Sequence, residues 1–348
     1  MVWGEQIWLT TATDEGTELY ALCVNLASGK IEHDLLVFEV RDPEFCHPSN
    51  SYASCTPFVE AGRVYVHFGT YGTACLDTQS GETLWERRDL HCDHFQGPAA
   101  SPIVHGNVLF LSFDGVDVQF VVALDKRTGK TIWRRDRNID FGTEAEDYKK
   151  AYSTPTVIRV GDQWQLISPA AMEAIAYDPQ TGNELWRVRH GGMNAAARPL
   201  FEGGLVYLSA GKGPTHLIAV RPQGTGDITA SAIEWGMGKS APYRSSQLIV
   251  EGRLMISDAG VASCLDATSG ESIWTKRVGG AHWASPVYAD GLIYLSSKAG
   301  MVTVIEAGPK FVLRTKNEFP SGFNASPAIA GDSLILRSFT DLYRVAAE

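Results

Sequence analysis

The stretch ALDKRTGKTIW at residues 123–133 decides the fold, because three close copies of it occur elsewhere in the chain. The copies are ACLDTQSGETLW at 74–85, AYDPQTGNELW at 176–186 and SCLDATSGESIW at 263–274. Each has an apolar run, an aspartate, a short polar turn with a glycine, and a second run that ends in tryptophan. Such self-similarity is typical of repeat folds, in which one unit cannot bury its apolar face without a neighbour.

Each part of this stretch has a structural role that follows from its chemistry. The apolar residues before Asp125 predict a strand, and residues 126–129 predict a hairpin turn. The aspartate can accept hydrogen bonds from the turn backbone, the glycine can adopt the positive φ that closes the turn, and the tryptophan can bury its ring against the next unit. We therefore assign structural roles to these repeat residues: Asp77, Gly81, Trp85, Asp125, Gly129, Trp133, Asp178, Gly182, Trp186, Asp266, Gly270 and Trp274.

A second signature precedes such hairpins. Ser or Thr followed by Pro leads, a few residues later, to a glycine and an apolar run, as at Ser101-Pro102 with Gly106. The turn glycines of this kind are Gly4, Gly62, Gly106, Gly161, Gly203, Gly252, Gly291 and Gly331, at intervals of 39 to 58 residues. This interval is the length of one four-stranded antiparallel sheet, and eight such sheets predict an all-β, eight-bladed β-propeller. An open solenoid is the alternative, although no capping repeats are visible.

We expect the whole chain, 1–348, to form a single propeller domain. The expected blades are 1–50, 51–96, 97–150, 151–194, 195–240, 241–281, 282–322 and 323–348. The position of Gly4 predicts that the sequence starts inside the first strand of a blade, and the last copy provides three strands. We therefore expect an N-terminal strand of the ring to be missing from this sequence, because propellers avoid an unpaired edge by pairing strands from both termini.

Together, the repeated stretches, the turn glycines and the Ser-Pro starts resemble the PQQ-like β-propeller repeat proteins. The chain is most similar to their non-enzymatic branch, the BamB outer-membrane assembly lipoprotein family. The resemblance covers essentially the whole chain and implies a fold like that of the quinoprotein alcohol dehydrogenases. It also implies a periplasmic or outer-membrane location and a protein partner in the cell envelope.

The enzymes of this family hold PQQ over a calcium ion at the propeller axis. For them the resemblance implies an adjacent cysteine pair, a tryptophan floor and calcium ligands with an aspartate base. None of the six cysteines is adjacent to another, and we find no carboxylate cluster in the expected axial loops. We therefore assign no catalytic, cofactor-binding or metal-binding residue and expect no cofactor, with PQQ and calcium as the alternative.

Composition narrows the choice of partners. The formal net charge of −10 gives no basic surface for nucleic acid, and no apolar run is long enough to span a bilayer. Cys23, Cys75 and Cys264 take the repeat position that alanine has in other copies, which favours a packing role. A bridge between Cys46 and Cys55 is conceivable, but nothing in the sequence supports it. We expect a monomer.

The loops that lead into the innermost strands are the expected binding region, because they gather at one end of the propeller channel. They are rich in aromatic and polar residues, Tyr243 among them. The candidates for ligand or partner binding are Tyr52, His94, Tyr152, Arg198, Arg244, His282 and Trp283. For the aromatic side chains the competing interpretation is packing between blades, and for the two arginines it is salt bridges between blades.

The run HCDHF at 91–95 is the densest group of potential metal ligands. It lacks the second pair of ligands that defines a zinc signature, so ordinary loop histidines are the favoured interpretation. No nucleophile elbow, phosphate loop or dinucleotide fingerprint occurs. The sequence therefore favours a non-catalytic, protein-binding scaffold of the cell envelope. The alternatives are a ligand-binding or PQQ-dependent oxidoreductase with a degenerate site, and a carbohydrate-binding propeller.

Overall fold

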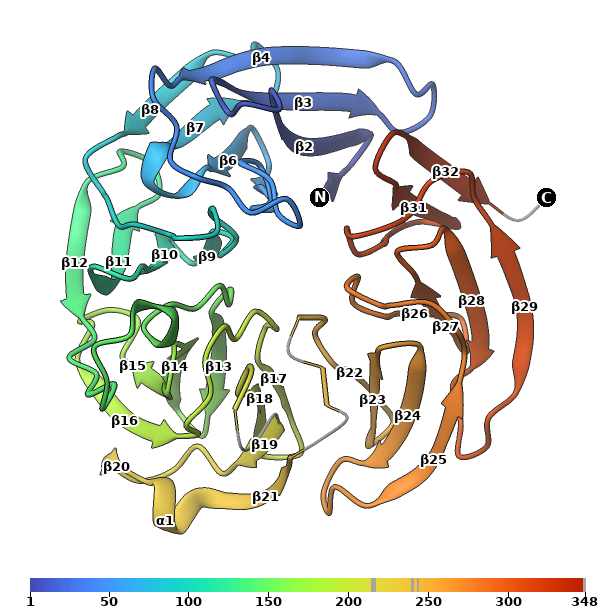
Figure 1. The fold of residues 1–348 in the computed structure, drawn as a ribbon. Helices are drawn as coiled ribbons and strands as arrows, with labels where there is room; N and C mark the ends of the chain where they lie inside the picture. The colour runs from blue at the N-terminus through green and yellow to red at the C-terminus, as the bar shows by residue number, and fades with distance from the viewer. Residues whose placement is uncertain (214–216, 239–240, 243, 347–348) are drawn as a thin grey trace. The chain divides into compact units, whose positions relative to one another are not determined.

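The computed structural model describes residues 1–213, 217–238, 241–242 and 244–346. These residues form eight antiparallel sheets, and Figure 1 shows their strands in chain order. The chain divides into two compact units, Met1–Arg189 and His190–Glu348, which are described separately. The prediction of eight mostly four-stranded antiparallel sheets is confirmed.

Unit 1 contains the first four sheets, and in each the strands follow one another in chain order. Their strands are β1 (Val2–Trp3), β2 (Gln6–Ala12), β3 (Glu18–Asn25) and β4 (Ile31–Glu39); β5 (Phe58–Glu60), β6 (Arg63–His67), β7 (Thr73–Asp77) and β8 (Thr83–Arg87); β9 (Ile103–His105), β10 (Val108–Asp114), β11 (Gln119–Asp125) and β12 (Thr131–Asp136); and β13 (Thr156–Val160), β14 (Gln163–Pro169), β15 (Glu173–Tyr177) and β16 (Glu184–Arg189). Two 3₁₀ turns, η1 (Gly69–Tyr71) and η2 (Glu146–Tyr148), lie in its loops.

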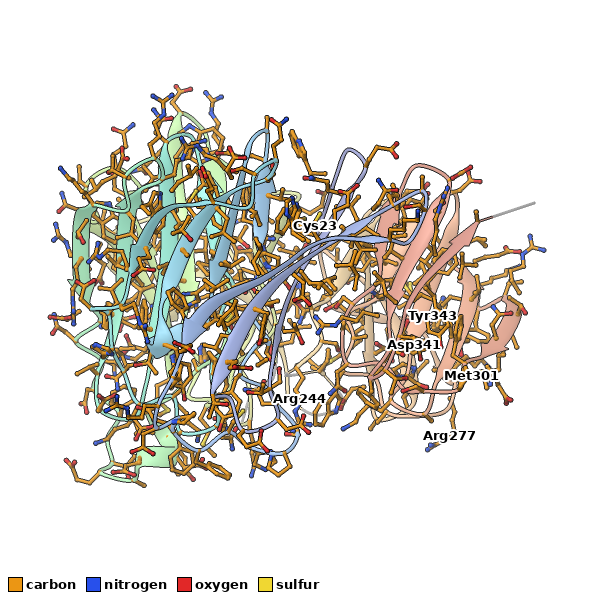
Figure 2. The ribbon with its side chains drawn as sticks, turned by 90° about the horizontal axis from the view of Figure 1, so that it is seen from above. Cys23, Arg244, Arg277, Met301, Asp341 and Tyr343 are labelled. Carbon is orange, nitrogen blue, oxygen red and sulfur yellow. The ribbon has the colours of Figure 1, made fainter. Side chains whose placement is uncertain are left out.

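Unit 2 contains the other four sheets, the last of which has three strands. Their strands are β17 (Leu200–Glu202), β18 (Leu205–Ser209), β19 (Leu217–Val220) and β21 (Ile233–Met237); β22 (Leu248–Val250), β23 (Arg253–Asp258), β24 (Val261–Asp266) and β25 (Ser272–Arg277); β26 (Val287–Ala289), β27 (Leu292–Ser296), β28 (Met301–Glu306) and β29 (Leu313–Glu318); and β30 (Ala328–Ala330), β31 (Ser333–Arg337) and β32 (Leu342–Ala346). Along the chain, the strand β20 (Gly226–Asp227) and the helix α1 (Thr229–Ala232) come between β19 and β21, which pair directly with each other. Figure 2 labels Tyr343 of β32 and Asp341, which directly precedes that strand, and the Tyr343 hydroxyl donates a hydrogen bond of 3.2 Å to the Asp341 carboxylate.

No helix among the described residues is both long enough and apolar enough to cross a membrane.

The strand alternation gives each sheet two distinct ends. The first and third hairpin turns of a sheet lie at one end, which we call the turn end. The second hairpin turn and the loop that leads into the innermost strand lie at the other, which we call the loop end. The glycine signature therefore marks the turn end, and the candidate binding residues belong to the loop end.

The aspartates of the repeat hold the third hairpin turn. In β11–β12, the Asp125 Oδ1 atom accepts hydrogen bonds from the backbone N–H of Arg127 at 3.1 Å and of Thr128 at 2.9 Å. Equivalent bonds reach Asp77, Asp178 and Asp266. These N–H donors lower the pKa of the Asp77 and Asp266 carboxyl groups.

A bulge recurs in the strand pairing immediately before each of these turns. In β11–β12 it falls between Ala123 and Leu124, and it places Ala123 directly opposite Trp133. Cys75 and Cys264 stand opposite Trp85 and Trp274 in the same way. The position is restricted to small side chains because a large ring lies across the strand pair, which explains why alanine and cysteine alternate there.

The tryptophan rings join neighbouring sheets through both a hydrogen bond and a close contact. The indole N–H of Trp133 donates to the Pro179 carbonyl of the next sheet at 3.0 Å, and Trp85, Trp235 and Trp274 make the equivalent bond. A methyl group placed on Gly182 would lie 2.6 Å from the Trp133 ring. The turn glycine is therefore the residue against which the preceding tryptophan packs. Trp186 differs, since its indole donates to Gln165 in its own sheet.

The Ser-Pro and Thr-Pro starts form a second connection between sheets. The backbone N–H of Thr56 donates to Ser101 Oγ at 2.9 Å, and the N–H of Ser101 donates to Thr154 Oγ1 at 2.9 Å. Unit 2 has three such bonds, each from a backbone N–H to a serine Oγ at 2.9 Å: Arg198 donates to Ser246, Ser246 to Ser285, and Ser285 to Ser326. We call this series the hydroxyl relay. It ties the starts of neighbouring innermost strands at the loop end.

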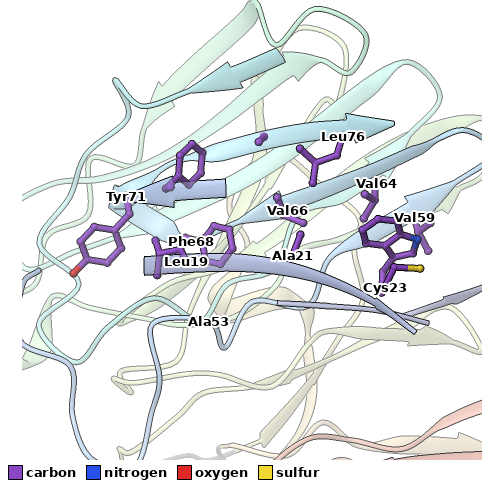
Figure 3. Packing of buried hydrophobic residues seen from close by; sticks show 13 residues of the cluster. Leu19, Ala21, Cys23, Ala53, Val59, Val64, Val66, Phe68, Tyr71 and Leu76 are labelled. Carbon is purple, nitrogen blue, oxygen red and sulfur yellow. The ribbon is translucent and has the colours of Figure 1, made fainter. Parts of the chain in front are cut away.

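The hydrophobic core consists of layers between neighbouring sheets. Between the first two sheets, Leu19 and Ala21 of β3 lie against Val64 and Val66 of β6, with Phe68 beside them (Figure 3). Further clusters occupy the next interfaces within each unit. Because every layer is shared by two sheets, no sheet can bury its core alone.

Candidate functional site

The loop end of unit 1 holds three of the sequence-predicted residues in a hydrogen-bonded framework. The hydroxyl of Tyr152 donates to the carbonyl of His94 at 3.2 Å, and the hydroxyl of Tyr52 donates to the carbonyl of Glu44 at 2.8 Å. The Asn50 side chain donates to the carbonyl of Gln96 at 2.9 Å. These hydrogen bonds connect the loops that lead into three sheets. The hydroxyl groups of Tyr52 and Tyr152, which the sequence suggested for binding, therefore also stabilise the loops.

His94 is buried, and its ring is held on both sides. Its Nε2 atom accepts a hydrogen bond from the backbone N–H of Thr70 at 3.2 Å, and the ring stacks on Phe113 with a centroid distance of 6.3 Å. Burial lowers the pKa of His94 to about 4, so the ring is neutral at physiological pH. His94 is therefore a buried, hydrogen-bonded residue of this loop.

The run HCDHF does not assemble metal ligands. Cys92 is buried and burial raises the pKa of its thiol, so the thiolate that would bind a metal is disfavoured. The Asp93 carboxylate accepts the N–H of Phe95 at 2.7 Å, and His91 lies 3.2 Å from the hydroxyl of Thr70. Among the residues that the structure describes, no group of three or more His, Cys, Asp or Glu side chains could hold a metal ion.

The loop end of unit 2 brings an indole and two cations together. The Arg244 guanidinium lies over the Trp283 ring, 4.2 Å from its centroid, and the Lys298 ammonium lies 3.4 Å from the same centroid. Arg244, labelled in Figure 2, is exposed, and Trp283 and Lys298 are half-buried. We call these three residues the cation–indole cluster. Each such contact contributes about 0.5–1 kcal/mol at a partly exposed position.

Lys298 was not among the sequence-predicted residues. It lies in the turn between β27 and β28, which belongs to the loop end, and its backbone N–H donates to the carbonyl of Ala281 at 2.9 Å. This bond fixes the turn against the loop that carries Trp283. Strand alternation could have predicted this position, because it places the second hairpin turn of each sheet at the same end as the loop that leads into the innermost strand.

His282 is 2% exposed, although it stands next to Trp283. Neither ring nitrogen has a hydrogen-bond partner among the described residues, and burial lowers the pKa of the ring. The ring is therefore buried in its neutral form. Arg198 is exposed and its backbone N–H belongs to the hydroxyl relay. Tyr243 lies outside the described residues.

The side chains do not fit the quinone and calcium of the family's enzymes. All six cysteines are free and none is adjacent to another, so the paired cysteines above the quinone have no counterpart. Cys46 and Cys55 are not bridged. A calcium ion needs several converging oxygen ligands, and the described residues provide no cluster of carboxylates.

Comparison with known proteins places the chain in a family. The model described as "Outer membrane protein assembly factor BamB" matches residues 11–159 and 117–347. The structure is similar to that of BamB from Moraxella catarrhalis, with a TM-score of 0.66, 12% identity and coverage of 95% of this chain and 88% of that one. It is also similar to a europium-containing methanol dehydrogenase, with a TM-score of 0.67, 11% identity and coverage of 96% and 81%.

The sequence is also similar to 1-butanol dehydrogenase (quinone) from Thauera butanivorans, with 28% identity over 235 residues, which are 58% of this chain and 33% of that protein. The chain spans about a third of the length of the curated relatives that it matches. These likenesses show the fold, an eight-bladed β-propeller. The chain belongs to the PQQ-like repeat family described as outer membrane protein assembly factor BamB.

Proposed function

We propose that this chain is a non-catalytic binding propeller of the cell envelope, which docks a protein partner at the loop end of unit 2. The observation that carries the proposal is the cation–indole cluster. Tryptophan and arginine are the residues most enriched among those that dominate binding energy at protein interfaces. Here Arg244 and Lys298 flank one indole, so the cluster suits an acidic segment of the partner that also buries an apolar side chain.

The framework at the loop end supports this proposal. The hydroxyl relay fixes Ser246 and Ser285, which follow Arg244 and Trp283 closely in the chain. The bond from Lys298 to Ala281 fixes the third member. A partner therefore meets side chains on a pre-ordered backbone, which lowers the entropy lost on binding.

A photocrosslinking experiment in cells of the source organism tests the proposal. p-Benzoylphenylalanine replaces the exposed Ala281, beside the cluster, and in a control it replaces Ile132, which is exposed on the outer strand β12. We expect a discrete crosslinked protein from position 281, lost when Arg244→Glu and Lys298→Glu are added, and none from position 132. Absence of a crosslink from position 281, or the same crosslinked protein from both positions, contradicts the proposal.

The second candidate is a quinone-dependent oxidoreductase, which the similarity to 1-butanol dehydrogenase (quinone) favours. The donor set described above does not fit that cofactor. Adding PQQ and calcium to the purified protein separates the two candidates, because a ligand of the folded state raises the melting temperature. A binding propeller predicts no saturable shift, whereas a saturable shift supports the oxidoreductase.

A further inference from the structure

A cavity of about 380 Å³ lies at the turn end of unit 1, away from the loop-end residues. It is lined by side chains from three sheets: Trp3, Glu60, Ala61, Arg63, Lys126 and Arg127. Trp3 ends β1, Glu60 and Arg63 flank the first turn of the second sheet, and Lys126 and Arg127 lie in the third turn of the third sheet. The volume is within the range of sites for small molecules.

The lining carries three cations and one carboxylate, in a chain whose formal net charge is −10. Both oxygens of the Glu60 carboxylate are occupied. Oε2 pairs with the Lys126 ammonium at 2.8 Å, and Oε1 accepts the Tyr65 hydroxyl at 2.9 Å. Glu60 and Lys126 therefore compensate each other, and the two arginines are the remaining cations of the lining.

The two guanidinium groups retain most of their hydrogen-bond donors. Among the described residues, Arg63 donates only to the Cys75 sulfur, at 3.7 Å, and Arg127 donates no side-chain hydrogen bond. Asp77 stands opposite Arg63 in the β6–β7 pairing, and Asp125 begins the turn that carries Arg127. Hydrogen bonds from the turn lower the pKa of both carboxyl groups, and the charges of Arg63 and Arg127 lower it further. Guanidinium donors in a cavity suit a carboxylate or phosphate group, which accepts two parallel hydrogen bonds.

Trp3 provides an apolar surface at the same cavity. Its side chain is 49% exposed, in contrast to Trp8 and Trp186, which are fully buried. Among the described residues, its indole makes no hydrogen bond to a neighbouring sheet of the kind that Trp85 makes to Lys126. An exposed indole beside arginines offers a flat face to a ring-bearing ligand.

We propose that this cavity binds a small organic anion, whose carboxylate or phosphate pairs with Arg63 and Arg127 and whose planar ring lies on the Trp3 indole. This site belongs to the turn end of unit 1, whereas the cation–indole cluster belongs to the loop end of unit 2. It is independent of the proposed docking of a partner, and either can fail without the other.

Calorimetric titration of the full chain with isophthalate, phenyl phosphate and the neutral isophthalamide tests the proposal. We expect saturable binding of at least one of the two anions and affinity at least about tenfold lower for the amide. Arg127→Gln and Trp3→Ala each reduce the affinity by about tenfold or more. Arg159→Gln is the matched control, because that arginine is exposed in the same unit and pairs with Asp162 outside the cavity.

Three results overturn the proposal: no saturable binding of either anion up to about 10 mM, equal affinity for the amide, or unchanged affinity in the Arg127→Gln protein. Unchanged affinity in the Trp3→Ala protein contradicts the role of the ring. Arg127 is exposed and makes no side-chain hydrogen bond with described residues, so its replacement leaves the fold intact. The test therefore does not depend on a variant of the half-buried Arg63.

Discussion

At the scale of single residues, the turn glycines meet two independent requirements. Gly182 has a φ of +69°, which L side chains rarely adopt, and a methyl group there would lie 2.6 Å from the Trp133 ring. Gly161 has a φ of +59°, but a methyl group there would meet no atom within 4 Å. The pair therefore separates the cost of backbone strain from the cost of displacing the indole.

We predict that Gly182→Ala destabilises the protein more than Gly161→Ala. The φ constraint costs about 1 kcal/mol at either site. Displacing the indole adds about 1–3 kcal/mol at Gly182 alone. Urea unfolding of both variants measures the difference, and equal losses would show that the contact with Trp133 contributes nothing.

Two buried histidines make stability depend on pH. Burial lowers the pKa of His67 to about 3 and that of His94 to about 4, from an ordinary value of 6.5. Between the folded-state pKa of each histidine and 6.5, the unfolded chain binds protons that the folded chain does not. The free energy of unfolding therefore falls as the pH falls below about 6.5. Above about pH 6.5 both histidines are neutral in the folded and the unfolded chain, so they no longer make the free energy of unfolding depend on pH.

We predict a loss of up to about 1.4 kcal/mol per pH unit for each of these histidines as the pH is lowered from about 6.5 to about 4. Denaturant unfolding across this range measures the slope. His94→Gln keeps an acceptor for the Thr70 N–H and removes one titrating group, so its slope should be smaller. The same slope in the variant would be inconsistent with a neutral, buried His94.

At the scale of elements, the hydroxyl relay explains why serine or threonine precedes proline at the start of an innermost strand. Proline has no N–H, so the preceding hydroxyl residue provides both the donor and the acceptor of the bonds between sheets. Arg198 can donate but has no hydroxyl to accept. Each bond of the relay therefore needs a donor from one sheet and a hydroxyl acceptor from the next.

We predict that Thr154→Ala lowers the free energy of unfolding by about 1 kcal/mol, because the N–H of Ser101 loses its acceptor. Thr225→Ala is the control, since that exposed threonine makes no hydrogen bond with described residues. Comparable stabilities of the two variants in urea unfolding would mean that water replaces the relay without cost.

The sequence was sufficient for the eight sheets and for the turns, because those depend on neighbours along the chain. Asp125 and Gly129 are recognisable since each acts on its own hairpin. The relay, the Lys298 contact with Trp283 and the turn-end cavity were not predicted. They join residues from different hairpins, and a linear pattern does not state which side chains meet across two sheets.

At the scale of the whole molecule, the residues that hold the sheets together differ from those that we propose bind a partner. The repeat residues occupy the turn ends and the interfaces between neighbouring sheets. The cation–indole cluster lies at the loop end, where the hydroxyl relay uses only the residues at the start of each innermost strand and Arg244, Trp283 and Lys298 are outside it. This separation is why the repeat identifies the family while saying little about activity.

The crosslinking yield at Ala281 in Trp283→Ala, compared with Trp164→Ala, tests this account most directly. Trp164 is also partly exposed, and its ring centroid lies 4.4 Å from that of His105, but it belongs to the turn end of the fourth sheet. We predict that Trp283→Ala abolishes the crosslink in a protein that still unfolds cooperatively and that Trp164→Ala preserves it. An undiminished crosslink in Trp283→Ala, or an equal loss in both variants, would contradict the account.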